Sequence, residues 1–417
     1  MSILNLKINA IDKNVFNSAD ITDVTVTAKD GTKASRREIV ALSRLLTSEY
    51  AGKQIASRPG FEGSFMSRLN EGQRYSDLSR NACDKTLLFC AGLANQAVGR
   101  EAPASIAEVK ANIGYSKDAH FLRTLGAIAT DVLTPVFYDI ISDVAMGGLM
   151  QWEAIPFGGV KEINIESNDV FVFEDSAWGS ARSASYNALY NKTITLNPHP
   201  YTAQAKAKWY QIAVNGDIGA YYNAIIRGMW SKIYAIFMQN LLAATSDTTK
   251  IPSGLKASTY TSDNWATITT LVAAANGVKR ENLLAYGMIK PLSRVLPVDG
   301  LGAAITGLQY GLGEEWFKQG FLPNAAGVQL LEVNPAIVPH TQNSTLETIG
   351  LGSNIFITAK AGYGYAPIYA GYYEGSPMTI EMTPDVTGDL TIDITATAMF
   401  DTKAVFGSKV GLLTNIT

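Results

Sequence analysis

The chain has 417 residues, of which 47% are hydrophobic and 17% are charged, and its formal net charge is -3 at pH 7. This length exceeds that of one ordinary hydrophobic core, so a globular protein of two or three domains is expected. The slightly acidic balance gives no electrostatic case for tight nucleic-acid binding, which needs a clustered basic surface. The first twenty residues lack an apolar core segment, so no signal peptide is expected.

Residues 1–118 are predicted to form a helical N-terminal arm. Apolar side chains recur at helical spacing over residues 36–49 and again over residues 78–98. Stripes of this width usually form a core within their own chain, but they would also suit wrapping against a neighbouring subunit. The second helix contains Cys83 and Cys90, the only cysteines, which are expected to be buried free thiols of a reducing compartment.

Residues 119–166 and 201–262 are predicted to form one domain. A helical pattern covers residues 121–150, and Pro135 is expected to break this helix because proline removes a backbone donor and clashes with the preceding turn. Residues 201–214 alternate in polarity, which predicts a strand that leads into the next helix.

That next helix, over residues 217–245, is predicted to be the longest in the chain, with Asn215 or Asp217 as its cap. Its apolar side chains recur every three or four residues: Tyr222, Ile225, Ile226, Met229, Trp230, Ile233, Phe237 and Leu241. Its apolar density approaches that of a membrane span, but Arg227 and Lys232 lie near its middle, and each would cost roughly 3 kcal/mol in lipid. We therefore predict no membrane span but a strut, with Arg227 and Lys232 assigned to subunit contacts.

Residues 167–200 are predicted to form a long two-stranded hairpin with a soft tip. The segment 175–185 at the tip is small and polar, and strand composition flanks it at residues 162–165, 170–174 and 186–196. A lone two-stranded ribbon is marginally stable in water. We therefore expect this hairpin to lie on another subunit.

Four side chains of the hairpin are candidate subunit contacts. Trp178 and Arg182 lie at the tip, and they are expected to be contact anchors because Trp and Arg are enriched at protein interfaces. Tyr190 and Lys192 on the returning strand are assigned to the same interface.

Residues 263–350 are predicted to form a second, mixed domain. A helix over residues 265–275 is expected to be capped by Ser262 or Asp263 and to end at Gly277. Strand patterns in this domain and after it occur at residues 282–287, 328–333, 354–359, 368–373, 378–382, 390–398 and 403–413.

The last part of the chain, residues 351–417, is predicted to supply strands that return to both domains. Trp316 lies in the loop-rich segment 301–321 and is a further candidate subunit contact. No repeat or low-complexity linker marks the domain boundaries.

No motif in the sequence carries catalytic machinery. The dinucleotide, phosphate-loop and nucleophile-elbow patterns are absent, and Asp385, Asp389 and Asp393 are interpreted as solvated turn carboxylates in preference to a cation site. The only histidines are far apart and have no companions at ligand spacing: His120, His199 and His340. We therefore expect no catalytic residue, no cofactor, no metal and no enzymatic activity.

The order of the predicted elements resembles that of the major capsid protein of tailed bacteriophages, which has the HK97-like fold. The resemblance covers roughly residues 120–417. Residues 158–165 with 170–174 resemble the lead into the extended hairpin called the E-loop, residues 217–245 the spine helix, residues 320–335 the axial-domain segment, and residues 401–413 the closing strand.

The resemblance implies an α+β shell protein with a peripheral and an axial domain. It implies self-assembly into hexamers and pentamers of an icosahedral capsid around double-stranded DNA, in the virion and, during assembly, in the host cytoplasm. Portal, scaffolding and decoration proteins are the implied partners, with only non-specific contact with DNA. The N-terminal arm is expected to clasp a neighbour and to remain in the mature particle.

Two alternatives stay open. The first is an encapsulin-like bacterial nanocompartment shell of the same fold, against which the long N-terminal arm counts. The second is an α+β enzyme, for which no residue constellation is found. Some capsid relatives join subunits by an isopeptide bond from a hairpin lysine, but residues 171–191 contain no lysine. We therefore expect non-covalent contacts alone.

Overall fold

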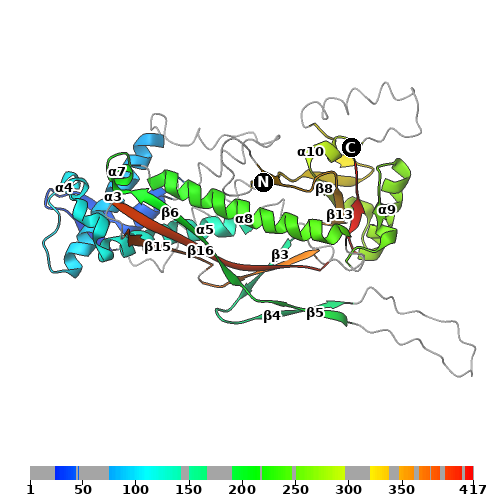
Figure 1. Ribbon diagram of the computed structural model, residues 1–417, viewed down its shortest axis with the longest axis horizontal. Coiled ribbons are helices and arrows are strands. Elements are labelled where there is room, and N and C mark those ends of the chain that lie inside the picture. Colours follow the sequence, from blue (N-terminus) through cyan, green and yellow to red (C-terminus); the bar gives the residue numbers. More distant parts are fainter. Residues whose placement is uncertain are drawn as a thin grey trace, which may run out of the picture. The chain divides into compact units, whose positions relative to one another are not determined.

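The computed structural model divides the chain into two compact units. Unit 1 comprises Met1–Ile140, Pro200–Trp230 and Ser376–Met399, and unit 2 comprises Ile141–His199, Ser231–Gly375 and Phe400–Thr417. Figure 1 shows the order of the elements along the chain. The structure describes residues 24–43, 46, 75–141, 150–166, 190–216, 218–246, 250–295, 320–337, 347–360, 366–375, 377–385, 390–405 and 409–416.

The first described elements of unit 1 form an antiparallel hairpin that contacts helix α3 (Tyr75–Ala97). Strand β1 (Thr25–Thr27) pairs with β2 (Lys33–Ser35), and residues 36–43 are helical. The helices that follow are α3 (Tyr75–Ala97), α4 (Ile106–Ala111), η2 (Ile113–Lys117) and α5 (Ala119–Ile141). The sequence correctly predicted α3, and it also predicted a strand over residues 21–27 and a turn over residues 29–32, which agree with β1 and the turn after it. It did not predict the returning strand β2.

The apolar stripes of this N-terminal region are buried within unit 1. Ile39, Leu87 and Phe89 are fully buried, and β1 lies so close to α3 that a Cβ atom at Gly92 would be 2.2 Å from Val26 Cγ1. In residues 24–43 and 75–117 the stripes thus contribute to a core within their own chain, which is the usual role of stripes of this width. The clasping of a neighbouring subunit by the arm stays a prediction.

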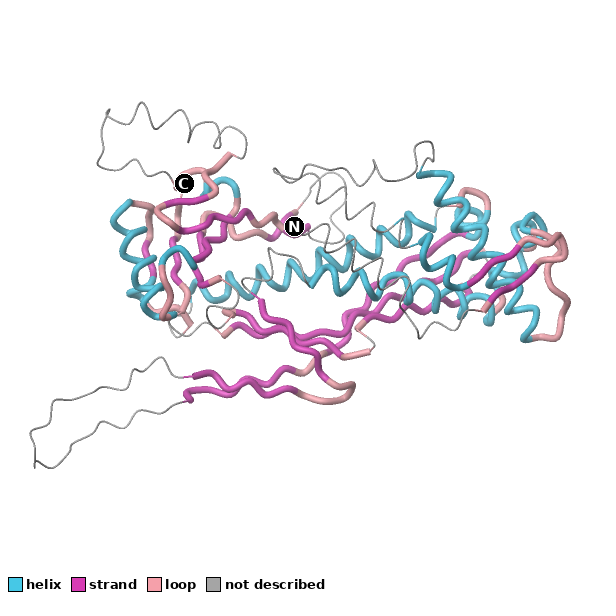
Figure 2. Tube along the Cα trace, turned by 180° about the vertical axis from the view of Figure 1, so that it is seen from behind, coloured by secondary structure: helices cyan, strands magenta, loops and turns pink. Residues whose placement is uncertain are grey.

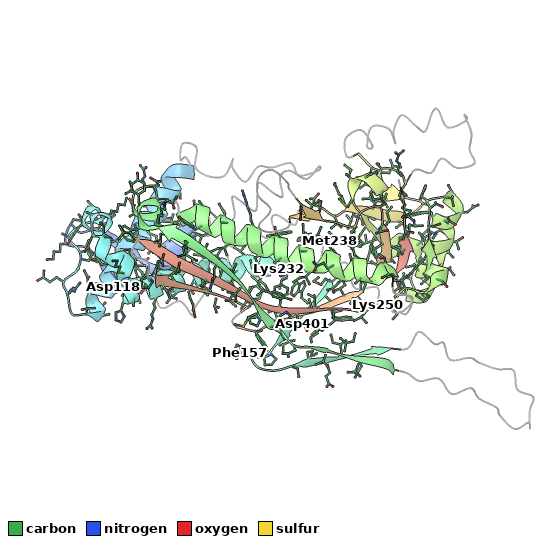
Figure 3. All side chains as sticks on the ribbon, viewed as in Figure 1. Asp118, Phe157, Lys232, Met238, Lys250 and Asp401 are labelled. Atoms are coloured by element: carbon green, nitrogen blue, oxygen red, sulfur yellow. The ribbon has the colours of Figure 1, made fainter. Side chains whose placement is uncertain are left out.

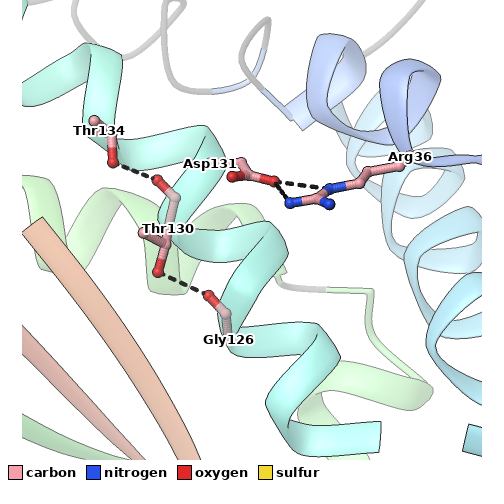
Figure 4. Close-up of polar contacts among 5 residues, drawn as sticks. All are labelled: Arg36, Gly126, Thr130, Asp131 and Thr134. Atoms are coloured by element: carbon pink, nitrogen blue, oxygen red, sulfur yellow. Dashed lines mark hydrogen bonds and ion pairs between the residues drawn. The ribbon is translucent and has the colours of Figure 1, made fainter. Parts of the chain in front are cut away.

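Helix α5 continues through Pro135, contrary to the predicted break. Val132, Val136 and Phe137 are buried around the proline, so packing holds the last two turns in place. In the turn before the proline, Thr134 Oγ1 donates to the carbonyl of Thr130 at 2.8 Å (Figure 4), but this bond does not replace the one that a backbone N–H at residue 135 would make. Tertiary packing thus overrides the local penalty of the proline.

The predicted strand before the long helix ends earlier than expected. Strand β6 (His199–Lys208) is followed by a short helix, α7 (Trp209–Ala213). Trp209 packs against Phe121 with ring centroids 5.7 Å apart, and Ile212 is buried three residues later. The prediction of a strand to residue 214 is wrong because this buried spacing fits a helical turn.

The predicted long helix is confirmed as α8 (Ile218–Ser246), although Asp217, one proposed cap, lies outside the described residues. The division between the units falls within α8, after Trp230. Of the predicted stripe, Met229, Ile233 and Phe237 are buried, whereas Ile225 is half-buried. Lys256 Nζ donates to the carbonyl of Thr245 at 2.8 Å and so caps the last turn.

Strand β16 (Thr391–Ala404) is the longest of the described strands, and its residues belong to both units. In unit 1 its first part pairs antiparallel with β15 (Met378–Pro384) and also pairs with β6. In unit 2 its last residues pair antiparallel with β14 (Ile368–Tyr373), which pairs in parallel with β3 (Met150–Ile155). Residue 150, which was assigned to the end of a helix, therefore begins a strand.

Unit 2 contains a second, six-stranded sheet covered by helix α9 (Ser262–Asn276). The strand order is β7 (Lys256–Ala257), β17 (Gly411–Leu413), β13 (Ile355–Ala359), β8 (Leu283–Gly287), β10 (Val328–Glu332) and β9 (Asn324–Ala325). Helix α9 ends at Gly277 as predicted, with a left-handed φ of 63°. Its N-cap is Thr261 rather than Ser262 or Asp263, because Thr261 Oγ1 accepts the N–H of Asn264 at 3.1 Å.

Short elements complete unit 2. They are η3 (Ser253–Leu255), η4 (Arg280–Asn282), α10 (Ile289–Leu292) and the hairpin of β11 (Ala336–Ile337) and β12 (Thr348–Ile349). The fold class is α+β, as the sequence predicted. Among the described residues, no helix combines the length and the apolarity that crossing a bilayer requires.

Candidate functional site

A two-stranded ribbon leaves the sheet of unit 2 directly after β3. Strand β4 (Lys161–Glu166) pairs antiparallel with β5 (Tyr190–Leu196), from Lys161 opposite Leu196 to Glu166 opposite Tyr190. Figures 1 and 2 show the two strands side by side. The chain that connects them, residues 167–189, lies outside the described residues. The predicted hairpin is therefore present as far as it is described, and its first paired strand is β4.

The two faces of the ribbon differ in polarity. The register places Ile163 opposite Ile194 on one face, where both are half-buried. The other face is exposed and polar, and Thr193 Oγ1 donates across it to Asn164 Oδ1 at 2.9 Å. A pair of strands cannot bury either face by itself, so much of the ribbon remains open to solvent.

The end of the ribbon that contains Ile163 and Leu196, here called its root, packs on the sheet. Leu196 is buried together with Ile155 and Tyr369, and Ile163 packs against this cluster. Strand β14 makes room with a glycine: a Cβ atom at Gly371 would lie 2.6 Å from Ile155 Cδ1. A larger residue at this position would clash with Ile155 and displace the ribbon from the sheet.

A buried carboxylate adds directed contacts at the same root. Asp401 Oδ2 accepts the backbone N–H of Asn197 at 3.0 Å, and Asp401 Oδ1 accepts that of Thr402 at 2.8 Å. The Asp401 side chain is only 7% exposed, and Lys403 Nζ lies 3.7 Å from it. The charge is buried with hydrogen bonds to both oxygens, as a buried carboxylate requires. Figure 3 labels Asp401 on β16.

The turn between β3 and β4 presents apolar side chains to solvent. Phe157, labelled in Figure 3, is 72% exposed and Val160 is 57% exposed. The turn is closed by a hydrogen bond from the N–H of Gly159 to the carbonyl of Pro156 at 2.9 Å. The Phe157 ring lies 5.1 Å from that of Tyr373, which holds it in place. An exposed phenylalanine held at a ribbon root is a candidate contact with another protein.

Carboxylates influence the aromatic side chains of this sheet. Burial raises the pKa of the Tyr369 phenol, and the charge of Glu153 raises it further. Burial likewise raises the pKa of Tyr372, with a contribution from Glu374. Both phenols therefore stay neutral at physiological pH and serve as packing groups here.

The structure brings few of the predicted contact residues together. Trp178, Arg182 and Trp316 lie outside the described residues, and Tyr190 and Lys192 are described only as backbone positions of β5. Arg227 and Lys232 are both exposed on α8, but the first belongs to unit 1 and the second to unit 2. Their assignment to subunit contacts stays a prediction.

The sequence reasoning missed four residues of the ribbon root: Phe157, Val160, Gly371 and Asp401. A signal for the first two was present, because a phenylalanine beside two glycines just before a strand indicates an exposed turn. No local signal identified Gly371 or Asp401. Their contacts join positions more than 150 residues apart in the chain.

The aspartates considered as a cation site are paired with a lysine instead. Lys206 Nζ lies 3.0 Å from Asp385 Oδ2 and 3.8 Å from Asp393 Oδ1. The side chain of Asp385 is only 6% exposed, so the prediction of a solvated carboxylate is wrong for this residue, while Asp389 lies outside the described residues. Within the described ranges, no group of three or more His, Cys, Asp or Glu side chains could hold a metal ion.

The two cysteines are buried in α3, as predicted. Cys83 Sγ donates to the carbonyl of Ile212 at 3.2 Å. Burial raises the pKa of the Cys90 thiol well above its ordinary value, and Cys83 adds to the effect. A protonated, buried thiol is a poor nucleophile, so Cys90 acts as a small core residue.

No protein-family model matches the chain, and no curated protein matches it. Among solved structures, the chain is similar to the acidic stable capsid of Helicobacter pylori bacteriophage KHP30, at 10% identity over 66% of this chain and 90% of that chain, with a TM-score of 0.44. It is similar to the capsid of the native GTA particle, at 14% identity over 66% of this chain and 91% of that chain, with a TM-score of 0.40. It is also similar to the SrpI encapsulin of Synechococcus elongatus PCC 7942, at 8% identity over 64% of this chain and 85% of that chain, with a TM-score of 0.35.

Proposed function

We propose that this chain is the structural major capsid protein of a tailed bacteriophage, which self-assembles into the hexamers and pentamers of an icosahedral shell around double-stranded DNA. The observation that carries the proposal is the ribbon of β4 and β5. Its root is packed in a buried apolar cluster, and its polar face is exposed to solvent. A second subunit would cover it, since an isolated two-stranded ribbon is marginally stable.

The order of the elements supports the same function. The ribbon is followed by β6, the long helix α8, a mixed six-stranded sheet and closing strands. In the proposed domain division, residues 1–118 are the arm, residues 119–166 and 201–262 the peripheral domain, residues 167–200 the E-loop, residues 263–350 the axial domain and residues 351–417 the returning strands. The described ribbon begins at residue 161 with β4, earlier than the proposed start of the E-loop at residue 167.

A shell subunit needs contact surfaces rather than a catalytic centre, and we infer that this chain is not an enzyme. The proposed partners are further copies of the chain, a portal protein and scaffolding or decoration proteins, together with non-specific contact with the packaged DNA. The proposed locations are the virion and, during assembly, the host cytoplasm.

Electron microscopy of the purified protein, combined with analysis of its contents, tests the proposal. The purified protein should form closed icosahedral shells, and particles isolated from infected cells should contain double-stranded DNA. Shells that contain a protein cargo instead would favour the encapsulin-like compartment over the capsid. A soluble monomer at all concentrations would overturn both functions.

Deletion of residues 176–185 tests the role of the ribbon. The deleted chain should remain folded, with unchanged thermal unfolding, because the seated root of the ribbon is left intact. It should fail to close shells. Normal particle yield from this deletion would contradict the assignment of the ribbon to subunit contacts.

A further inference from the structure

A continuous polar linkage joins the ribbon root to the second half of α8. Asp401 accepts the backbone N–H of Asn197, which is the first residue after β5. Its neighbour Thr402 donates its N–H to the same carboxylate, and Thr402 Oγ1 accepts a hydrogen bond from Asn240 Nδ2 of α8 at 2.9 Å. All of these residues belong to unit 2. In Figure 3, Asp401 lies between Met238 of α8 and Phe157 beside the ribbon.

We propose that Asp401 is a positioning residue that sets the angle at which the ribbon leaves the sheet, and that Thr402 and Asn240 couple this angle to α8. The inference rests on the proposed function, in which the ribbon reaches another subunit. A small change of angle at the root moves the far end of a ribbon by a larger distance, so the angle determines which surface the ribbon meets.

The apolar cluster at the root cannot set the angle by itself. Contacts among Leu196, Ile155 and Tyr369 hold the ribbon on the sheet, but apolar attraction has no preferred direction. A hydrogen bond weakens steeply when it is bent, so the bond from the Asn197 N–H to Asp401 restricts rotation. The cluster therefore fixes where the ribbon sits, and the carboxylate fixes its direction.

The substitution Asp401→Asn changes the hydrogen-bonding capacity of this side chain but not its shape. An ionised carboxylate offers two acceptor oxygens, and here each one takes a backbone N–H. In Asp401→Asn one oxygen becomes an amino group, which presents hydrogens to one of these donors. One of the two directed contacts is then lost without a change in volume.

The experiment measures the angle in the isolated full-length chain. Spin labels are attached through Thr193→Cys on β5 and Ala274→Cys on α9, two exposed positions of unit 2, while Cys83 and Cys90 are buried and do not react. Pulsed electron spin resonance gives the distance distribution between the labels. Hydrogen exchange of the Asn197 amide reports the bond to Asp401 directly.

We expect a single narrow distribution in the parent chain. Asp401→Asn should broaden it and speed exchange of the Asn197 amide about 10- to 100-fold, as expected for the loss of a hydrogen bond to a charged group. Asn240→Ala should speed this exchange less, by at most about 10-fold, because the bond from Asn197 to Asp401 is kept and only the neutral bond that supports Thr402 is removed. Asp393→Asn is the matched control, since its carboxylate lies on the same strand but faces Lys206 in unit 1. It should change neither measurement.

Unchanged distances and exchange in Asp401→Asn would overturn the positioning role. A change in Asp401→Asn without one in Asn240→Ala would overturn the coupling to α8. If Asp401→Asn does not fold, Asp401→Glu replaces it, because the longer carboxylate keeps the charge and should shift the mean distance; an unshifted mean would then contradict the proposal. Failure of the parent chain to form shells would reject the proposed function but leave the measured angle, so the two failures are distinguishable.

Discussion

The N-terminal segment, residues 24–43, and the ribbon of β4 and β5 are both built from short elements, yet one is buried and the other is exposed. Val26, Ala34 and Ile39 of the segment are almost completely hidden from solvent. On the ribbon, Glu162, Asn164, Thr193 and Thr195 are exposed. The contrast arises from the number of elements that each one contacts.

Hydrogen bonds and ion pairs hold the N-terminal segment along its length. The N–H groups of Lys29 and Asp30 donate to the carbonyls of Pro103 and Ala104 at 3.1 Å, and Arg36 Nε donates to Asp131 Oδ2 of α5 at 2.9 Å (Figure 4). Strands β1 and β2 also contact α3. The described part of the ribbon, in contrast, is held at its root, by the cluster of Leu196 and by the hydrogen bond from the Asn197 N–H to Asp401.

The comparison shows that a narrow apolar stripe does not by itself indicate a contact with another subunit. A stripe on a helix of three or more turns can be covered by neighbouring helices of the same chain. The described strands of the ribbon pair with each other, and in the proposed function another subunit covers them. The following predictions test this difference in order of their expected effect on the stability of the folded chain.

The largest effect is expected from Ile39→Ala in the N-terminal segment. Ile39 is fully buried, so its truncation should lower the free energy of unfolding by about 2–5 kcal/mol. Denaturant unfolding measures this change. Val98→Ala, which alters a half-exposed residue of the same unit, should cost less than about 0.5 kcal/mol. Equal stability of the two variants would mean that the segment is not docked.

Arg36→Ala should cost about 1–2 kcal/mol, because it removes a guanidinium that pairs with the half-buried Asp131 carboxylate. The two side chains are 32% and 25% exposed, so solvent screens this pair only in part. A double-mutant cycle with Asp131→Ala measures the coupling between them. The highly exposed pair of Lys29 and Glu101 is the control and should show no measurable coupling. Coupling as weak as that of the control would contradict a structural role for Arg36.

Tyr222→Phe should leave the stability unchanged or raise it by up to about 1 kcal/mol at pH 8. Tyr222 is buried beside α3, and no hydrogen-bond partner of its hydroxyl is found in the described part of the chain. Burial raises its pKa above the unfolded value of about 10, so the unfolded state ionises first and stability falls as the pH rises above 10. The variant should lose less stability between pH 8 and pH 11; an identical loss would contradict this assignment.

The smallest effect on the chain itself is expected from Phe157→Ser beside the ribbon. Phe157 is largely exposed, so the free energy of unfolding should change by less than about 0.5 kcal/mol. Light scattering should nevertheless show that assembly begins at a higher protein concentration than in the parent chain, because an aromatic contact between subunits is lost. Val98→Ser is the matched control in unit 1 and should assemble normally. Normal assembly of Phe157→Ser would exclude this turn from the subunit contact.

Elements whose signals are local could be predicted from the amino-acid sequence. The helix predicted over residues 217–245 was found at Ile218–Ser246, and the strand predicted over residues 368–373 was found with the same bounds. Gly277 ends α9 as expected. Periodicity and glycine conformation suffice in these cases because they depend on neighbours a few residues away. The contact roles of Trp178, Arg182 and Trp316 stay predictions.

Features that depend on contacts between distant residues could not be predicted in this way. The burial of Val132, Val136 and Phe137 keeps α5 helical through Pro135. The contact of Trp209 with Phe121 favours the helical turn of α7. The burial of Asp401 requires the N–H of Asn197, which lies 204 residues away in the chain. A buried charge or a helical proline is unfavourable by local rules, so no local pattern can predict it. It becomes stable only when the fold supplies the contacts that compensate its cost.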